Sequence, residues 1–306
     1  MGARISSLKH IQRALLAWHH AHALQAPWRD SRDPYHALVA AVMAQQTQMS
    51  RVVPSYERFV AAFPTVESLA AASAGDVIRV WAGMGYNQRA VRLHRAARRI
   101  AADGWPRTAA ALTEIDGIGP FTAAIIASFA FAEPAACVDT NVRRVLGRLA
   151  GDESIDGAQL QALADASIAA GAPASWNQAL MDYGARVCTA RPKCGECVVA
   201  SWCPCRREVA PLARVADARA AYDAGPRPRA KKREAPFEGS ARYYRGRIVD
   251  LLRALPPGDA LALDALPALI ANGNPPPDAA LTAGLVAALE RAGLAQVRAG
   301  AVSLPD

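Results

Sequence analysis

The chain has 306 residues, enough for one large domain and one small one, and its hydrophobic content of 52% can supply a sizeable core. Aromatic residues make up only 6%, and much of the hydrophobic content is alanine, which favours helices over sheets. Lys and Arg outnumber Asp and Glu by 35 to 27. This excess suits a polyanionic partner such as nucleic acid, although any Arg-rich protein would show the same balance.

Nothing in the sequence indicates a membrane or secreted protein. No apolar run approaches the roughly 20 residues that span a bilayer. The amphipathic N-terminal segment lacks a signal-peptide core and a cleavage site. We therefore expect a cytoplasmic protein, associated with the nucleoid, whose six cysteines are not structural disulfides.

Hydrophobic spacing predicts a helix over residues 5–20, a proline-broken loop over 25–35, and helix after helix from 36 to about 131. Short breakers separate these helices: Phe63-Pro64-Thr65, Gly83-Met84-Gly85 and Gly117-Ile118-Gly119-Pro120. No strand alternation appears before residue 290. The expectation is an all-α body.

The composition changes at about residue 207. Residues 207–238 are rich in Ala, Arg and Pro and are typical of an extended basic linker. A second small unit, 239–306, is expected to hold three helices and then two short strands about a tight turn. The expected helices are 241–254, 262–271 and 278–293, and the expected strands are 294–298 and 300–304. This order is that of a winged-helix module; a generic small helical domain is the alternative.

Four cysteines lie within 16 residues, with the spacing C-x5-C-x2-C-x5-C: Cys188, Cys194, Cys197 and Cys203. Four thiolates so close in sequence can converge on one metal centre, either zinc or a [4Fe–4S] cluster. Zinc sites usually have two C-x2-C pairs, whereas here a single pair lies between two lone cysteines, which favours the cluster. Cys205 could compete as a ligand, and Cys137 is expected to be a small core residue.

A glycine turn joins two expected helices near residue 117. Gly117 and Gly119 would let backbone N–H groups approach a phosphate at a helix N-terminus. This is the pattern of a helix-hairpin-helix, which binds the DNA backbone; a plain helical corner is the bland alternative. About twenty residues later Asp139 precedes a helical run. It is either a helix N-cap or a carboxylate that faces a cationic intermediate.

These signals occur together in one order, and the chain resembles the helix-hairpin-helix (HhH-GPD) DNA glycosylase superfamily, in particular its MutY-like, A/G-specific adenine glycosylase branch. The resemblance covers about residues 8–206. Its motifs are PWR at 27–29, DPY at 33–35, VMAQQTQ at 42–48, FPT at 63–65, WAGMGYNQRAVRLHRAA at 81–97, IDGIGPFTAAI at 115–125, VDTNVRRVLGR at 138–148 and NQALMDYGARVCTARPKC at 177–194. The family usually has six residues between its first two cysteine ligands, and this chain has five.

The resemblance implies an all-α, two-lobed glycosylase domain over 1–206 with an iron–sulfur cluster loop. The hairpin lobe would take about residues 26–134. The cluster lobe would combine 1–25 with 135–206. A flipped nucleotide would then enter between the lobes.

The resemblance also implies roles for individual residues. Asp139 corresponds to the carboxylate that stabilises the sugar oxocarbenium ion, and Asn141 to a residue that positions catalytic polar groups. Phe121 occupies the position that is lysine in strand-cutting relatives, so no Schiff base can form there and base cleavage should be monofunctional. Gln45 and Gln46 correspond to the glutamines that fill the space of the extruded base, and Tyr86 to the aromatic residue that wedges beside the opposite base. The other DNA contacts are expected from Thr47, Gly117, Gly119, Phe121 and Arg143. The cluster ligands would be Cys188, Cys194, Cys197 and Cys203.

One family residue is missing. MutY-like enzymes carry a glutamate four residues before the first of the two glutamines, and here that position is Ala41. That glutamate protonates the leaving adenine, and general acid catalysis is typically worth about 10²–10⁴ in rate. No acidic residue on the same helix replaces it. Asp33, in the preceding loop, is the nearest carboxylate, and His36 is another candidate acid.

Three functions remain open. The expectation we favour is a preference shifted to a base that leaves without such an acid, with uracil, thymine and hypoxanthine as candidates. Alternatively, it releases adenine opposite G or 8-oxoguanine with the help of another acid. The third reading is a non-catalytic lesion-binding protein. In each case the partner is double-stranded DNA with a mismatch or lesion, and we expect a monomer.

Overall fold

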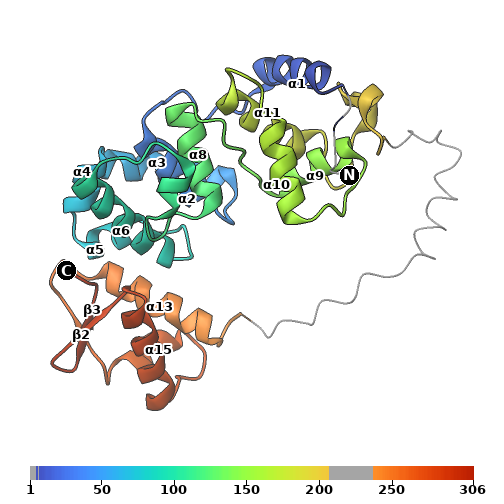
Figure 1. Ribbon diagram of the computed structural model, residues 1–306. Coiled ribbons are helices and arrows are strands. Elements are labelled where there is room, and N and C mark those ends of the chain that lie inside the picture. The colour runs from blue at the N-terminus through green and yellow to red at the C-terminus, as the bar shows by residue number, and fades with distance from the viewer. Residues whose placement is uncertain (1–4, 6, 207–236) are drawn as a thin grey trace, which may run out of the picture. The chain divides into compact units, whose positions relative to one another are not determined.

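The computed structural model describes residues 5, 7–206 and 237–306, so the basic linker expected at 207–238 lies almost entirely outside the described residues. Helices dominate the described chain, and the all-α expectation for the body is confirmed (Figure 1). Among these described residues, none of the helices has the length and apolarity required to cross a membrane. The chain forms two compact units. Among the described residues, the first comprises 5, 7–38, 106–114 and 119–206, and the second comprises 39–105, 115–118 and 237–306.

Among the described residues of the first unit, all regular secondary structure is helical. Its elements are α1 (Leu8–His22), the start of α2 (Pro34–Ala44), α7 (Ala109–Thr113), α8 (Pro120–Phe131), α9 (Thr140–Ala150), α10 (Gly157–Ala166), α11 (Pro173–Arg186) and two 3-10 turns, η1 (Cys194–Glu196) and η2 (Ala200–Trp202). Helix α1 begins and ends two or three residues later than the spacing predicts.

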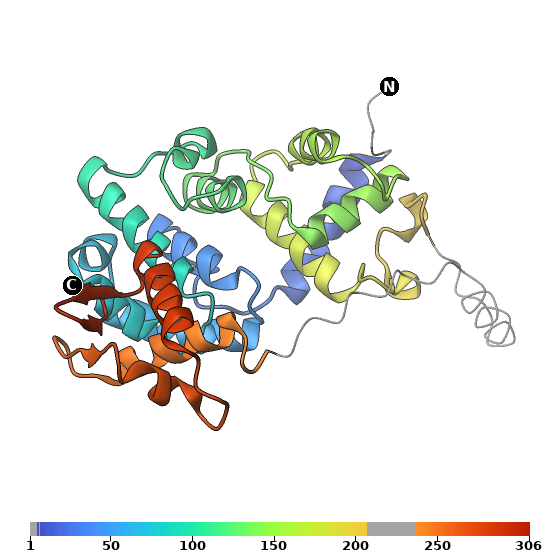
Figure 2. The ribbon, with the colours of Figure 1, turned by 90° about the horizontal axis from the view of Figure 1, so that it is seen from below.

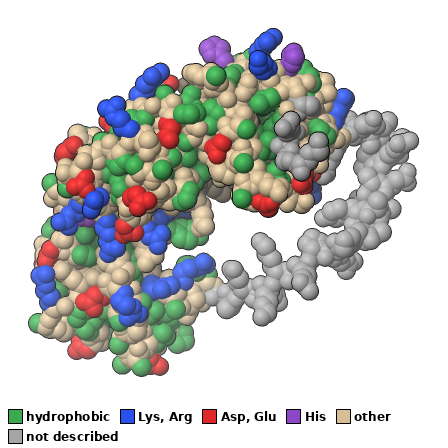
Figure 3. Space-filling view, viewed as in Figure 1, with side chains coloured by type: hydrophobic (Ala, Val, Ile, Leu, Met, Phe, Trp, Pro, Cys, Tyr) green, Lys and Arg blue, Asp and Glu red, His purple; other side chains and the backbone are tan. Residues whose placement is uncertain are grey.

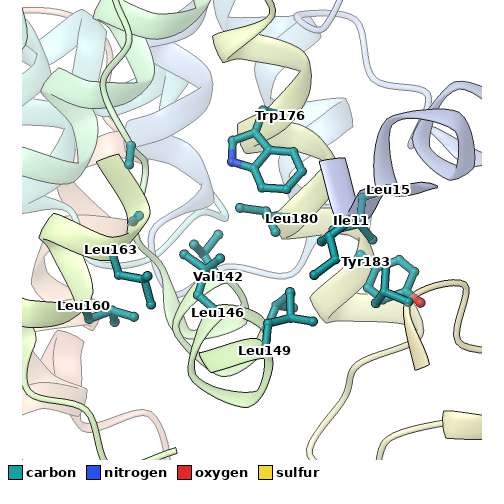
Figure 4. Close-up of a cluster of buried hydrophobic side chains, with 14 of the residues drawn as sticks. Ile11, Leu15, Val142, Leu146, Leu149, Leu160, Leu163, Trp176, Leu180 and Tyr183 are labelled. Atoms are coloured by element: carbon teal, nitrogen blue, oxygen red, sulfur yellow. The ribbon is translucent and has the colours of Figure 1, made fainter. Parts of the chain in front are cut away.

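The core of this unit lies between α1, α9, α10 and α11 (Figure 4). Apolar side chains recur at helical spacing on α9, where Val142, Leu146 and Leu149 point into the same cluster as Trp176 and Leu180 of α11. Burial of five such side chains stabilises the unit by roughly 1.5–3 kcal/mol each. The core therefore fixes the N-terminal end of α9, where Asp139 lies.

A buried ion pair explains the PWR motif. Both oxygens of the Asp182 carboxylate on α11 accept hydrogen bonds from Arg29 at 2.7 Å, and His19 of α1 lies 3.5 Å away. Burial alone would raise the pKa of Asp182, but the hydrogen bonds from His19 and Arg29 lower that pKa to about 2. The irregular segment after α1 is thereby tied to α11.

The second unit contains the remaining helices and a small sheet. Its elements are the rest of α2, α3 (Met49–Ala62), α4 (Val66–Ala71), α5 (Ala74–Val80), α6 (Gln88–Asp103), α13 (Ala241–Ala254), β1 (Leu261–Ala262), α14 (Leu266–Ala271), α15 (Ala279–Arg291), β2 (Gln296–Arg298) and β3 (Ala301–Ser303). Side-chain caps begin several of these helices, as at Thr65, where Thr65 and Ser68 cap each other.

The C-terminal residues 237–306, the C-terminal module hereafter, have winged-helix topology. The three strands form a sheet in the order β1-β3-β2, and both pairings are antiparallel. Two expectations were wrong in detail. Leu261–Ala262 form a strand where the start of a helix was expected, and this strand precedes residue 290. Two residues are too few to show alternation, and their pairing with β3, forty residues later, is set by tertiary contacts.

The C-terminal module packs on α5 and α6 of the same unit (Figure 2). Ile78 of α5 and Val91 of α6 belong to one buried cluster with Ile248, Leu252 and Leu289 of the module. The module thus shares a hydrophobic core with the two helices that flank residues 81–87.

Candidate active site and cysteine loop

Asp139 is the N-cap of α9. One carboxylate oxygen accepts hydrogen bonds from the backbone N–H groups of Asn141 and Val142 at 2.8 and 2.7 Å, which is the capping role weighed from the sequence. The other oxygen accepts a hydrogen bond from the Asn141 side-chain amide at 2.9 Å. The carboxylate is half-buried, and its orientation is fixed from both sides. Capping does not exclude a catalytic role, because Oδ2 accepts only one hydrogen bond and retains capacity to accept another.

Asn141 is held in turn by Arg144. The Arg144 guanidinium donates to Asn141 Oδ1 at 2.8 Å, to the Gly184 carbonyl at 2.6 Å and to the Cys188 carbonyl at 2.6 Å. A continuous chain of hydrogen bonds therefore runs from the backbone of Cys188 to the Asp139 carboxylate. A Cβ at Gly184 would lie 2.6 Å from Asn141 Cβ, so α11 must approach the start of α9 without a side chain.

The four predicted metal-ligating cysteines and Arg148 line one pocket. The other residues that line this pocket are Val187, Pro192, Lys193, Ala200, Cys205 and Arg206. Arg148 is buried, donates to Cys188 Sγ at 3.5 Å and also binds the carbonyls of Thr189 and Ala190. No three His, Cys, Asp or Glu side chains in the described ranges are placed to bind a single metal ion. The thiols thus surround a shared space without meeting at one point. Cys137 is fully buried in the core, as expected.

The turn after α2 carries the glutamines. Gln45 and Gln46 are exposed, and Gln46 adopts a left-handed φ of 52°, which is uncommon for a residue other than glycine. Thr47 is half-buried. Such a turn leaves the carbonyls at the end of α2 without helical partners, so another group must satisfy them.

Arg89 of α6 supplies that group. Its buried guanidinium donates to the carbonyls of Val42, Met43 and Gln45 at 3.1, 2.9 and 2.6 Å and to the Thr47 hydroxyl at 3.1 Å. It also donates to the carbonyls of Met84 and Gly85. Arg89 therefore joins the glutamine turn to the turn that carries Tyr86.

Tyr86 is 59% exposed and has a φ of 44°. It follows two glycines of positive φ, Gly83 and Gly85, and precedes α6. The Arg89 guanidinium lies 5.5 Å from the Tyr86 ring centroid and 5.4 Å from that of Trp81, within cation–π range. Sequence reasoning did not single out Arg89. Arg89 lies in an Arg-rich helix, and it differs from the other arginines of that helix only in its position on the apolar side of the amphipathic pattern.

The hairpin glycines have different surroundings. Gly117 has a φ of 91°, and a Cβ there would lie 2.9 Å from Arg92 Cβ, so glycine is required by both conformation and space. Gly119 is the N-cap of α8, and a Cβ placed there would meet no atom within 4 Å. The backbone at Gly119 is therefore open to an approaching group. Phe121 is half-buried on α8. Arg143 is exposed on α9 and donates to the Ile155 carbonyl.

Ala41 is buried among apolar residues of α2, with 7% of its surface exposed. Asp33 is occupied at the start of the same helix, where its carboxylate accepts from the Tyr35 N–H at 2.8 Å. Of the predicted site residues, Gln45, Gln46, Thr47, Tyr86 and Gly117 belong to the second unit and the others to the first.

The comparisons with known proteins agree with this fold. A family model described as HhH-GPD superfamily base excision DNA repair protein matches residues 39–166. An adenine DNA glycosylase of Mycobacterium tuberculosis is 36% identical over 250 residues, 78% of this chain and 77% of the relative. An adenine DNA glycosylase of Homo sapiens is 37% identical over 64% of this chain and 39% of the relative.

Solved structures show the same fold. A thermostable thymine-DNA glycosylase is 28% identical, with a TM-score of 0.61 over 65% of this chain and 96% of that one. A trapped endonuclease III–DNA intermediate has a TM-score of 0.56 at 23% identity and shows the fold alone. The chain therefore belongs to the HhH-GPD superfamily of base excision DNA repair proteins. Within it, the chain is a MutY-like DNA glycosylase, as the resemblance implied.

Proposed function

We propose that the protein is a monofunctional DNA N-glycosylase that hydrolyses the glycosidic bond of a flipped base and whose preference has shifted from adenine toward uracil, thymine or hypoxanthine. The observation that carries this proposal is Ala41. A methyl group cannot protonate a leaving adenine, and the position is buried among apolar side chains, where no nearby group on the helix supplies an acid. Uracil, thymine and hypoxanthine leave more readily as anions.

The arrangement of Asp139 supports retained catalysis. Its carboxylate is oriented by α9 and by Asn141, and an ionised carboxylate lowers the energy of an adjacent oxocarbenium ion. A protein that only binds lesions would have little need for the chain from Arg144 to Asp139. Phe121 supports the monofunctional outcome, since it offers no amine for a Schiff base.

The sequence and structure comparisons favour different bases. The relatives at about 36% identity are named adenine DNA glycosylases, whereas the thymine-DNA glycosylase is similar in structure at 28% identity. Retained adenine release through another acid is therefore the second candidate. His36 and Asp33, at the start of α2, are the residues that this alternative would use.

Single-turnover assays would test the proposal on four duplexes: A opposite 8-oxoguanine, U opposite G, T opposite G, and hypoxanthine opposite T. We expect release of at least one of the last three bases, and loss of that release in Asp139→Asn with DNA binding retained. Fast release of adenine, with none of the others released, would establish the adenine candidate instead. Binding without release of any base, unchanged in Asp139→Asn, would support the non-catalytic reading.

We also propose that Cys188, Cys194, Cys197 and Cys203 hold a [4Fe–4S] cluster. The four thiols line one pocket but are not placed for a single ion, which suits a cofactor that binds each thiolate at a separate iron. Arg148, next to Cys188 Sγ, would stabilise a thiolate. When bound, the cluster would fix the shape of the loop over residues 188–203. Iron and sulfide analysis together with the visible absorbance spectrum would test this. Four zinc-binding thiols without iron would contradict it.

The partner proposed is double-stranded DNA with a mismatch or lesion, bound by one copy of the protein in the cytoplasm. Support comes from the exposed Gln45, Gln46 and Tyr86 and from the open backbone at Gly119. The glycosylase domain would comprise residues 1–206 and the C-terminal domain residues 239–306.

A further inference from the structure

The helix of the C-terminal module that would enter a major groove lacks side chains that read bases. In a helix-turn-helix, residues near the N-terminus of the second helix contact base edges in the major groove. That helix is α15 here, and it begins Ala279-Ala280-Leu281, with no side chain that could form a hydrogen bond to a base. From Ala279 to Glu290 it contains no Lys or Arg. The module must therefore contribute something other than sequence readout.

Its contacts with α5 and α6 are specific. Gly75, at the start of α5, donates its N–H to the Pro305 carbonyl at 2.8 Å, and a Cβ at Gly75 would lie 2.7 Å from that oxygen. Gly293 is also confined, though less tightly: its φ is 69°, and a Cβ there would lie 3.2 Å from Val91 Cγ1 of α6. Close backbone contacts of this kind fix one arrangement of the module on its own unit.

The central contact is made by Arg253 of α13. Its Nε donates to the Ile78 carbonyl at 2.9 Å, and its Nη2 donates to Asn87 Oδ1 at 2.8 Å. Only 10% of the Arg253 side chain is exposed, and Asp250, 3.1 Å away, balances its charge. Burial lowers the pKa of Arg253, whereas Asp250 raises it. A buried, paired arginine holds its hydrogen-bond acceptors in fixed positions.

Asn87 directly follows Tyr86. The turn over residues 83–87 contains two positive-φ glycines, and Tyr86 itself has a φ of 44°, so the turn has little conformational preference of its own. Arg89 holds this turn from the side of the glutamines, and Arg253 holds it from the side of the C-terminal module. In the space-filling view, Lys and Arg side chains gather where the module meets α5 and α6 (Figure 3).

We propose that the C-terminal module is an internal brace for the Tyr86 turn and that Arg253 is the positioning residue through which it acts. The inference rests on the proposed function for one point, namely that Tyr86 enters DNA. An ordered turn would not have to be immobilised when DNA binds, which raises affinity without a new phosphate contact.

Two readouts on Arg253→Met separate the brace from a direct DNA contact. The first is hydrogen exchange of residues 83–88 in DNA-free protein. The second is affinity for a duplex with an abasic-site analogue, measured against salt concentration. We expect faster exchange at the turn with unchanged exchange in α9 and α11. Affinity should fall about five- to tenfold, as for one or two lost hydrogen bonds. The slope of log K against log salt should be unchanged, since no phosphate contact is lost.

Arg298→Met is the matched control, because it removes the same charge from the module at an exposed residue that pairs with Asp306. It should change neither exchange nor affinity. Arg253→Lys should recover part of both effects. In an Asn87→Ala background, Arg253→Met should add little to exchange at the turn, because Arg253 reaches the turn through Asn87 Oδ1. Gly75→Val disturbs the module at another contact and should also accelerate exchange at the turn.

Unchanged exchange at residues 83–88 in Arg253→Met would overturn the proposal. So would a salt slope reduced by about 0.9, the value for one lost phosphate contact. The proposal would also be overturned if Arg253→Met showed faster exchange at the turn but bound DNA with full affinity. This outcome counts against it only if Tyr86→Ala weakens DNA binding. If Tyr86→Ala binds normally, the proposed role of Tyr86 in DNA fails, and the exchange data alone decide whether the module braces the turn.

Discussion

Arg144 and Asn141 form the link between the cysteine loop and the candidate catalytic carboxylate. Arg144 Nη2 donates to Asn141 Oδ1 at 2.8 Å, and the same guanidinium binds the Gly184 and Cys188 carbonyls. Asn141 can then present only its amide N–H₂ to Asp139. The orientation of Asp139 thus depends on residues up to 49 positions away in the chain.

Replacement of Arg144 by Lys should lower the rate of base release about tenfold or more, with DNA affinity nearly unchanged. A lysine keeps the charge but cannot bind three oxygens in a fork. Single-turnover rates at saturating enzyme would measure the effect. An equal loss in affinity and rate would indicate a general folding defect and contradict the positioning role.

Gly184→Ala should destabilise the protein and slow base release. The new Cβ would lie 2.6 Å from Asn141 Cβ and 2.9 Å from the Asn141 carbonyl oxygen, so the start of α9 must move. We expect a loss of about 1–3 kcal/mol in the free energy of unfolding. Gly246→Ala is the matched control: Gly246 lies within α13 with nothing within 4 Å, and the change should stabilise by about 0.5–1 kcal/mol.

Arg89→Met should cost about 3 kcal/mol or more in urea unfolding, because it leaves several buried carbonyls without a donor. Arg92→Met, one turn further along α6 at an exposed position, should change stability by less than about 0.5 kcal/mol. Similar effects of the two substitutions would show that Arg89 does not hold the turns together.

The pH dependence of stability should reflect Asp182. Its pKa of about 2 lies below the unfolded value of about 3.9, so its contribution is complete above about pH 5 and is lost as the pH falls through 2. That contribution is about 2–3 kcal/mol. Urea unfolding between pH 6 and pH 2 should show this loss in the wild type. In Asp182→Asn the loss over the same pH range should be smaller by about that amount; an unaltered acid transition in this variant would contradict the assignment.

Much of the fold could be predicted from local signals. The first helix of the C-terminal module was expected at residues 241–254 and is found there, because a Ser N-cap and helical spacing mark it in the sequence. The HhH-GPD fold followed from motifs whose order could be read directly, and the comparisons confirm it. The sequence indicates Asp139 as a helix N-cap or a catalytic carboxylate, and the capping geometry is confirmed.

The residues that hold the site together could not be found in this way. Arg89, Arg144 and Arg253 are three of many arginines, and their importance depends on burial and on acceptors that are distant in sequence. Strand β1 was missed for the same reason, because its partner is Val302. Patterns in sequence report periodicity and short motifs, whereas these interactions are set by tertiary packing.

The most direct test of the central claim is adenine release by Ala41→Glu compared with the wild type, on a duplex with A opposite 8-oxoguanine. Ala41→Gln, which has the same size but carries no acid, is the control. We expect Ala41→Glu to release adenine about 10²–10⁴ times faster than either the wild type or Ala41→Gln, because it restores the general acid. Rapid adenine release by the wild type, with no gain in Ala41→Glu, would contradict the claim that this pocket lacks the acid that adenine requires.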